Sequence, residues 1–278
     1  MCLRWRHLVL LSTSRLQVHL LFTPRKPSSD PALTCLLHLP ILVDYSVGFW
    51  TKKDEDLAHA AIFHHSRVRG IALAGPCASR LLRELCHPFP KLESFEFCFP
   101  FRFSTPYHMH KLIISATFLL PAPCLRRLTL RKFVPTCLSP LLSSATGLVE
   151  LALTIRVRRS VLPDACVLPD TSLIANLQRL SCLRCLELKL ANQDIAITPD
   201  SPPSPAGDVV RLIKLTDFIF MGCAPYVDML VARLVAPSLQ RLDAEFWSGC
   251  RDFPITHLCK FICDTECQFS VVRLDLFR

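Results

Sequence analysis

A short hydrophobic phrase recurs along this chain: a leucine, two residues, a second leucine, one residue and a third leucine. Strict copies begin at Leu125, Leu148 and Leu183. The first two starts are 23 residues apart, the shortest interval between successive copies, and the last two are 35 residues apart, the longest. Looser copies, with Val, Ile, Phe or Ala at some positions, begin at Val68, Leu92, Leu215, Leu239 and Val271. Such recurrence is typical of stacked repeat proteins, in which each unit buries its apolar side against its neighbours.

Each phrase predicts a β-strand, because its last positions alternate between apolar and polar residues, as in Leu128-Thr129-Leu130. Segments with helical spacing lie between the phrases, at 80–86, 138–142, 173–180, 227–234 and 257–267. Strands that alternate with helices predict a parallel sheet with right-handed crossovers. The predicted fold class is therefore α/β, a leucine-rich-repeat-like solenoid with a curved parallel sheet and with helices and loops on the convex side.

The pattern continues before the first phrase. Residues 16–22 and 40–47 alternate and predict two more strands, which we expect to extend the sheet in parallel, with Pro40 favouring an edge position. The proline-rich segment 199–207 can form neither strand nor helix and predicts a surface insertion. We therefore expect one irregular repeat array over residues 16–278, interrupted by that insertion.

Composition and the N-terminal sequence bear on where in the cell the protein acts. Of the 278 residues 51% are hydrophobic, but no apolar run approaches the roughly 20 residues that a membrane-spanning helix needs. The first 14 residues do not have the pattern of a secretion signal. The 15 cysteines are irregularly spaced, which favours reduced, buried thiols. We expect an intracellular protein, cytoplasmic or nuclear, that does not bind membranes.

The net charge of +9 raises the question of nucleic acid. The basic residues are scattered along the sequence, and no basic run contains interleaved aromatic residues. We therefore expect protein partners rather than nucleic acid.

Two cysteine patterns could bind a metal. Cys182 and Cys185 form a Cys-x-x-Cys without a second pair at zinc-finger spacing. Cys259, Cys263 and Cys267 would line one face of a predicted helix, where we expect them to pack in the core. Phosphate-loop, Gly-x-Ser-x-Gly and His-Glu-x-x-His motifs are absent. We predict no catalytic, cofactor-binding or metal-binding residues; a hydrolase whose site the sequence hides is the remaining alternative.

The positive candidate is a surface. Residues that flank the last apolar position of each phrase should face away from the core, in columns across strands about 4.8 Å apart. We expect Asp243 to lie beside Asp275 in one column and Arg241 beside Arg273 in the next. The predicted partner-binding residues are Glu96, Arg127, Thr129, Glu150, Glu187, Asp217, Arg241, Asp243 and Asp275. The alternative is that pairs such as Arg127–Glu150 and Asp217–Arg241 only join neighbouring strands.

A resemblance to a known protein family implies a function for this chain. The segment Cys2-Leu3-Arg4-Trp5-Arg6-His7-Leu8-Val9-Leu10 is similar to the last helix of an F-box, where Cys-x-x-Trp-Arg-x-Leu is typical. With the leucine-rich array over about 67–278, the chain resembles F-box proteins with leucine-rich repeats of the fungal type. The resemblance implies that residues 1–15 are the remnant of an F-box whose earlier part is missing, and that Trp5, Leu8 and Val9 contact a Skp-type adaptor.

The same resemblance implies a non-catalytic substrate-recognition subunit of a cullin-type ubiquitin ligase, which would bind the ubiquitination substrate through the array. The alternative is a leucine-rich-repeat scaffold that binds a protein partner and is unrelated to ubiquitin. The asparagine of regular leucine-rich repeats is also missing, since Phe133 and Arg156 stand at its position. This difference predicts an irregular array.

Overall fold

A computed structural model describes the backbone in a series of segments separated by gaps. They are residues 20–22, 40–45, 60, 62–74, 81, 88–98, 122–133, 142, 145–155, 171–190, 209–246, 255–264 and 271–276. The chain divides into two compact units, Met1–Leu125 (unit 1) and Arg126–Arg278 (unit 2). The predicted F-box remnant at 1–15 and the predicted insertion at 199–207 lie outside the described residues.

Unit 1 contains parallel strands in chain order. They are β1 (Leu20–Phe22), β2 (Ile41–Tyr45), β3 (Val68–Ala74) and β4 (Ser94–Cys98). β1 pairs with β2, β2 with β3, and β3 with β4, which confirms that the two early strands extend the sheet in parallel. The prediction of an edge strand at Pro40 was wrong: β2 lies between β1 and β3. Pro40 directly precedes β2, where its missing N–H interrupts no pairing.

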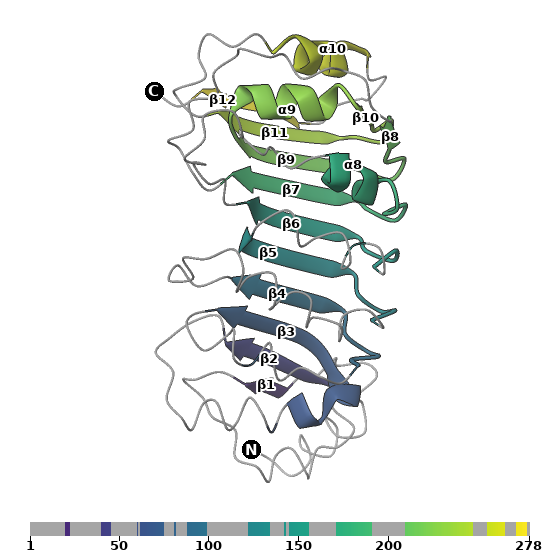
Figure 1. The fold of residues 1–278 in the computed structure, drawn as a ribbon, viewed down its shortest axis with the longest axis vertical. Helices are drawn as coiled ribbons and strands as arrows, with labels where there is room; N and C mark the ends of the chain where they lie inside the picture. The colour runs from purple at the N-terminus through teal and green to yellow at the C-terminus, as the bar shows by residue number, and fades with distance from the viewer. Residues whose placement is uncertain are drawn as a thin grey trace, which may run out of the picture. The chain divides into compact units, whose positions relative to one another are not determined.

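Unit 2 contains a longer run of parallel strands (Figure 1). Its sheet strands are β5 (Arg127–Phe133), β6 (Glu150–Ile155), β7 (Cys185–Leu190), β9 (Asp217–Gly222), β11 (Arg241–Phe246) and β12 (Val271–Leu276). Each strand pairs in parallel with the next one in this order. All the strands predicted from the leucine phrases of this unit are therefore present, and the parallel α/β prediction is confirmed.

A recurring turn precedes most of these strands. Its first and fourth residues are buried, and the fourth residue's N–H donates to the carbonyl of the first. The turns are Ala145–Leu148, Leu180–Leu183, Leu212–Leu215 and Ala236–Leu239 in unit 2, with Phe89–Leu92 in unit 1, at N–O distances of 3.0–3.1 Å. The first leucine of each phrase thus closes a turn, and the next two belong to the strand. This explains the spacing of two residues followed by one.

A ladder of shared carbonyl acceptors aligns the strand starts of unit 2. The carbonyl of Arg126 accepts from the N–H groups of both Val149 and Glu150, at 2.8 and 2.9 Å. The carbonyls of Val149, Arg184 and Thr216 each accept in the same way from two consecutive residues at the start of the next strand. Backbone carbonyls therefore align the strand starts at this edge of the sheet, and the Thr216 hydroxyl adds a third donor to the Arg184 carbonyl at 3.1 Å.

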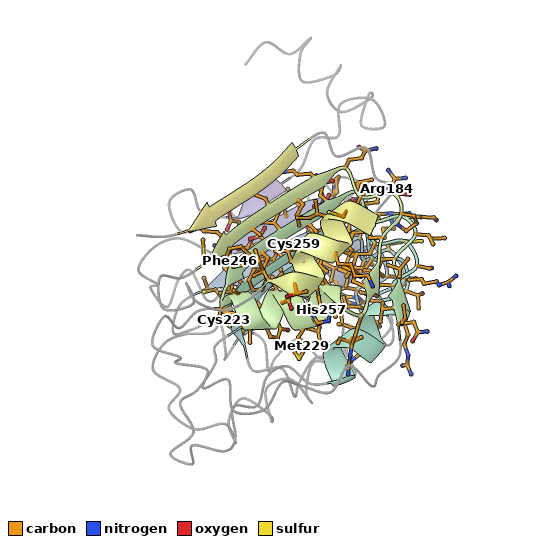
Figure 2. All side chains as sticks on the ribbon, turned by 90° about the horizontal axis from the view of Figure 1, so that it is seen from above. Arg184, Cys223, Met229, Phe246, His257 and Cys259 are labelled. Carbon is orange, nitrogen blue, oxygen red and sulfur yellow. The ribbon has the colours of Figure 1, made fainter. Side chains whose placement is uncertain are left out.

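One face of the unit 2 sheet is buried, and we call it the covered face. Its side chains alternate with the others along every strand, as the buried Leu151, Leu153 and Ile155 of β6 show. Helices α8 (Thr171–Leu177), α9 (Ala224–Val231) and α10 (Thr256–Asp264) belong to this unit. Figure 2 shows α9 and α10 on the same side of the strands. The rings of Phe220 on β9 and Tyr226 on α9 stack with centroids 5.9 Å apart, so α9 packs against the covered face.

The helix predictions were confirmed at α8, α9 and α10, with corrections at two ends. α8 stops at Leu177, so residues 178–180 lie outside the helix. α9 stops at Val231, and Leu234 begins the two-residue strand β10 (Leu234–Val235). β10 pairs in parallel with β8 (Val210–Arg211), so that they form a separate two-stranded sheet. Figure 1 places β8 and β10 at the edge where the strands of unit 2 begin.

The prediction that the cysteines of α10 pack in the core was wrong. Cys259 and Cys263 are exposed, whereas Leu258 and Phe261 are buried; Cys267 lies outside the described residues. Burial of the aliphatic Leu258 and the aromatic Phe261 stabilises the protein more than burial of a thiol would, so α10 turns the face with these two residues inward.

A buried carboxylate holds α10 in place. Asp228 on α9 is 6% exposed; its Oδ1 accepts from the Leu258 N–H and its Oδ2 lies against His257 Nδ1, both at 2.8 Å. Leu258 lies in the first turn of α10, whose N–H groups have no partner within the helix. Asp228 therefore caps α10 from a neighbouring helix.

Candidate interaction surface

The face of the unit 2 strands opposite the covered face is half-exposed, and we call it the open face. Its residues alternate with the buried ones on β6, β7, β9 and β11, as predicted. Because the strands are parallel and in register, equivalent positions form rows across the sheet. The first row is Arg127, Glu150, Cys185, Asp217 and Arg241. This is the predicted column as far as β11.

The second row follows two residues further along each strand. It consists of Thr129, Ala152, Glu187, Ile219 and Asp243, again as predicted. The sequence interpretation did not name a third row, which consists of Arg131, Thr154, Lys189, Met221 and Glu245. The signal for it was present, since the same alternation runs one step further along each strand.

The predicted columns were wrong at β12. Asp243 pairs with Arg273, and Asp275 pairs with Glu245, whereas Arg241 pairs with Val271. The shift is two residues, so it leaves the assignment of residues to the two faces unchanged, because side chains repeat with a period of two. Val272, rather than the predicted Leu274, therefore pairs with Leu242, the second apolar position of its phrase.

Three ion pairs order the charges of the open face. Arg127 Nε lies 3.0 Å from Glu150 Oε1 on the neighbouring strand, which confirms that expected pair. Arg241 does not bond Asp217; its Nη2 lies 3.0 Å from Asp243 Oδ2 on its own strand, and Asp217 accepts from the Thr216 hydroxyl at 2.7 Å. Lys189 Nζ lies 2.6 Å from Glu187 Oε1. All of these side chains are partly exposed, so the pairs add little stability and leave charge available to a partner.

Cys185 lies at the centre of the first row. Its pKa is raised, first by burial and then by the carboxylates of Asp217, Glu150 and Glu187, while Arg241 acts in the opposite direction. A thiol in this setting keeps its proton at neutral pH, and the thiolate is the nucleophile and metal ligand. Cys182, in the preceding turn, lies 4.0 Å from Lys214 Nζ. Cys185 therefore contributes shape and a weak hydrogen-bond donor to the open face.

The remaining predicted residues fall in other regions. Glu96 lies on β4 of unit 1, where it is partly exposed. Trp5, Leu8 and Val9, the predicted adaptor contacts, lie outside the described residues. Within the described segments, no three His, Cys, Asp or Glu side chains gather in a way that could hold a metal ion. Nor does any helix of those segments have the length and apolar character to span a membrane.

No protein-family model matches this sequence, and comparison with curated proteins gives no match. The open face can nonetheless be described chemically. Its rows combine cations, carboxylates, hydroxyls and the apolar Ile219 and Met221, which are the groups that protein interfaces use for specific contacts.

Proposed function

We propose that this chain is a non-catalytic protein-binding subunit. In this proposal the parallel strands belong to one leucine-rich-repeat-like solenoid, and the open face binds a protein partner. One observation carries it: the register aligns different polar side chains at equivalent positions of five successive strands, β5, β6, β7, β9 and β11, over a purely apolar covered face. Repeat proteins commonly bind through such a face.

We extend the proposal to substrate recognition for a cullin-type ubiquitin ligase. The support is the resemblance of residues 2–10 to the last helix of an F-box. Trp5, Leu8 and Val9 would contact a Skp-type adaptor, while the open face would bind the ubiquitination substrate. A protein with this role would act in the cytoplasm or nucleus.

Alanine substitution on the open face tests partner binding. E187A/D243A removes two carboxylates of the second row without touching the covered face, so the variant should fold and lose its partners. The proteins retained by the wild-type chain and by the variant are compared by quantitative mass spectrometry. E93A, which removes an exposed carboxylate in unit 1, is the matched control. Equal retention by all three chains would overturn the assignment of the open face.

A separate experiment tests the ubiquitin connection. Purified Skp-type adaptor is mixed with the wild-type chain and with W5A/L8A, and the complex is measured by size-exclusion chromatography. The proposal predicts a complex that W5A/L8A weakens. If a chain that retains partners through its open face forms no complex with the adaptor, it is instead a scaffold unrelated to ubiquitin.

A further inference from the structure

The β8–β10 pair forms a second surface, away from the rows of the open face. Its residues alternate between buried and exposed: Val210 and Leu234 are buried, and their neighbours Arg211 and Val235 are exposed. The N–H of Val210 donates to the carbonyl of Arg233 at 2.8 Å, and that of Leu212 to the carbonyl of Val235 at 2.9 Å. We call the outward side of this pair, with Val209, Arg211, Ile213, Arg233 and Val235, the ribbon face.

Apolar and cationic side chains alternate on the ribbon face. Val209, Ile213 and Val235 are 52%, 56% and 41% exposed, and they are the exposed large hydrophobic residues of unit 2 within the described segments. The register places Arg211 beside Val235. Arg233 and Val209 immediately precede the paired residues Leu234 and Val210. Exposed apolar side chains gathered next to charged ones indicate a binding site.

Basic residues gather in three segments on and beside the ribbon face. The segments 209–216 and 232–240 contain Arg211, Lys214 and Arg233 but no Asp or Glu, and the adjacent segment 178–184 adds Arg179 and Arg184, again without a carboxylate. Lys214 Nζ lies 4.0 Å from Cys182 Sγ, so the 209–216 and 178–184 segments are neighbours. Figure 2 shows Arg184 projecting from this edge of unit 2.

These cations are far apart in the sequence, and the fold brings them together. Arg179, Arg211 and Lys214 lie in or just before a turn that leads into a strand, Arg184 directly follows such a turn, and Arg233 directly precedes β10. The parallel arrangement of the strands places these turns at one edge. The Ser238 hydroxyl donates to the carbonyl of Ile213 at 2.7 Å, which joins two successive turns directly. The scattered basic residues of the sequence thus become one basic edge.

We propose that the ribbon face binds an extended acidic polypeptide segment in which carboxylate and apolar side chains alternate at every second residue, so that both kinds lie on the side of the segment that meets the ribbon face. Guanidinium groups bind carboxylates with two parallel hydrogen bonds, and the exposed Val and Ile side chains accept the apolar residues between them. Nucleic acid fits less well, because segments 178–184, 209–216 and 232–240 contain no aromatic side chain on which bases could stack. This site is independent of the open face.

The test uses the full 278-residue chain and fluorescein-labelled peptides. The probe is a 12-residue peptide in which Glu and Val alternate at every second position with Ser between them, compared with its Lys-Val counterpart and with a single-stranded oligonucleotide of equal charge. Binding is measured by fluorescence anisotropy at several salt concentrations. We expect the Glu-Val peptide to bind most tightly, and its affinity to fall as salt rises because the contacts are charged.

Variants locate the site. R211E/K214E should weaken Glu-Val peptide binding about tenfold or more, because like charges then face each other. I213S/V235S should weaken the same peptide but leave binding of oligoglutamate unchanged. K91E is the matched control: Lys91 is the third residue of its turn in unit 1, as Lys214 is in unit 2. E187A/D243A should bind the peptide normally, so failure here is distinguishable from failure of the proposed function.

The substituted side chains are exposed or, at Glu187 and Asp243, partly exposed, and far-UV circular dichroism with thermal unfolding verifies that each variant folds. Unchanged affinity in R211E/K214E would overturn the proposal. So would tighter binding of the oligonucleotide than of the peptide, since that result would assign the basic edge to nucleic acid.

Discussion

The covered and open faces of unit 2 are built from the same strands but differ in how much the residue type varies. On the covered face, β6, β7 and β9 present only Leu, Ile or Phe at the paired positions, and all of these side chains are buried. On the open face, the first row alone contains Arg, Glu, Cys and Asp at successive strands. One register thus serves two purposes: the uniform face supplies folding free energy, and the varied face supplies specificity.

The largest effect is expected from a change on the covered face. L186A truncates a side chain that is 0% exposed at the centre of the β7 strand, so it should lower the free energy of unfolding by about 2–5 kcal/mol. Urea unfolding followed by circular dichroism measures it. The adjacent open-face change E187A is the control and should stay within about 0.5 kcal/mol of wild type. Similar losses in both variants would mean that the two faces are not distinct.

Asp228 is a buried carboxylate behind the covered face, and its removal sharpens the comparison. D228A leaves the buried Leu258 N–H without its acceptor and should cost about 1–3 kcal/mol. D228N keeps one carbonyl oxygen for that N–H and should recover part of the loss. Hydrogen exchange measured by mass spectrometry should show faster exchange in α10 in D228A. Exchange as slow as in wild type would contradict the capping role.

The Cys185 thiol on the open face should react slowly, because it is partly buried and because its surroundings disfavour the thiolate. Because burial and the neighbouring carboxylates raise the pKa of Cys185, maleimide at neutral pH should modify it more slowly than the exposed Cys259 and Cys263. The folded-state pKa exceeds the unfolded one, so the stabilisation from this group is complete below the unfolded pKa and is lost as pH rises through the folded one. Peptide mapping of timed reactions gives the rates. Labelling of Cys185 first would argue against this environment.

The smallest effect concerns an ion pair on the open face. Arg127 and Glu150 are 66% and 46% exposed, so their coupling should be only a few tenths of a kcal/mol. A double-mutant cycle of R127A, E150A and R127A/E150A measures it by urea unfolding. A coupling above about 1 kcal/mol would mean that this row contributes to folding as well as to recognition.

Most of the sheet could be predicted from the sequence because the leucine phrase has a fixed length. That length fixes both the face and the register of β5, β6, β7, β9 and β11. The phrase length did not predict the register of β12. Val271 and Val272 are both apolar, and a shift of two residues leaves the same residues on each face of the sheet.

Other features carried a weaker signal or a misleading one. β8 and β10 are two residues long, too short to show a period, and only the fold reveals that Arg211 and Arg233 lie together. On α10, the cysteine spacing led to the prediction of a buried cysteine face, but the structure buries the face that carries Leu258 and Phe261. The basic edge could not be predicted from runs of charge, because each repeat contributes only one or two cations.

The parallel register of the open face is the claim on which the interaction surface depends, and thiol cross-linking tests it most directly. R127C/E150C places two thiols on Cα partners of neighbouring strands, whereas R127C/T154C places the second thiol four residues, or about 13 Å, further along β6. After reaction with dibromobimane and peptide mapping, the account predicts efficient cross-linking of the 127–150 pair and little of the 127–154 pair. Equal yields, or a preference for the 127–154 pair, would contradict it.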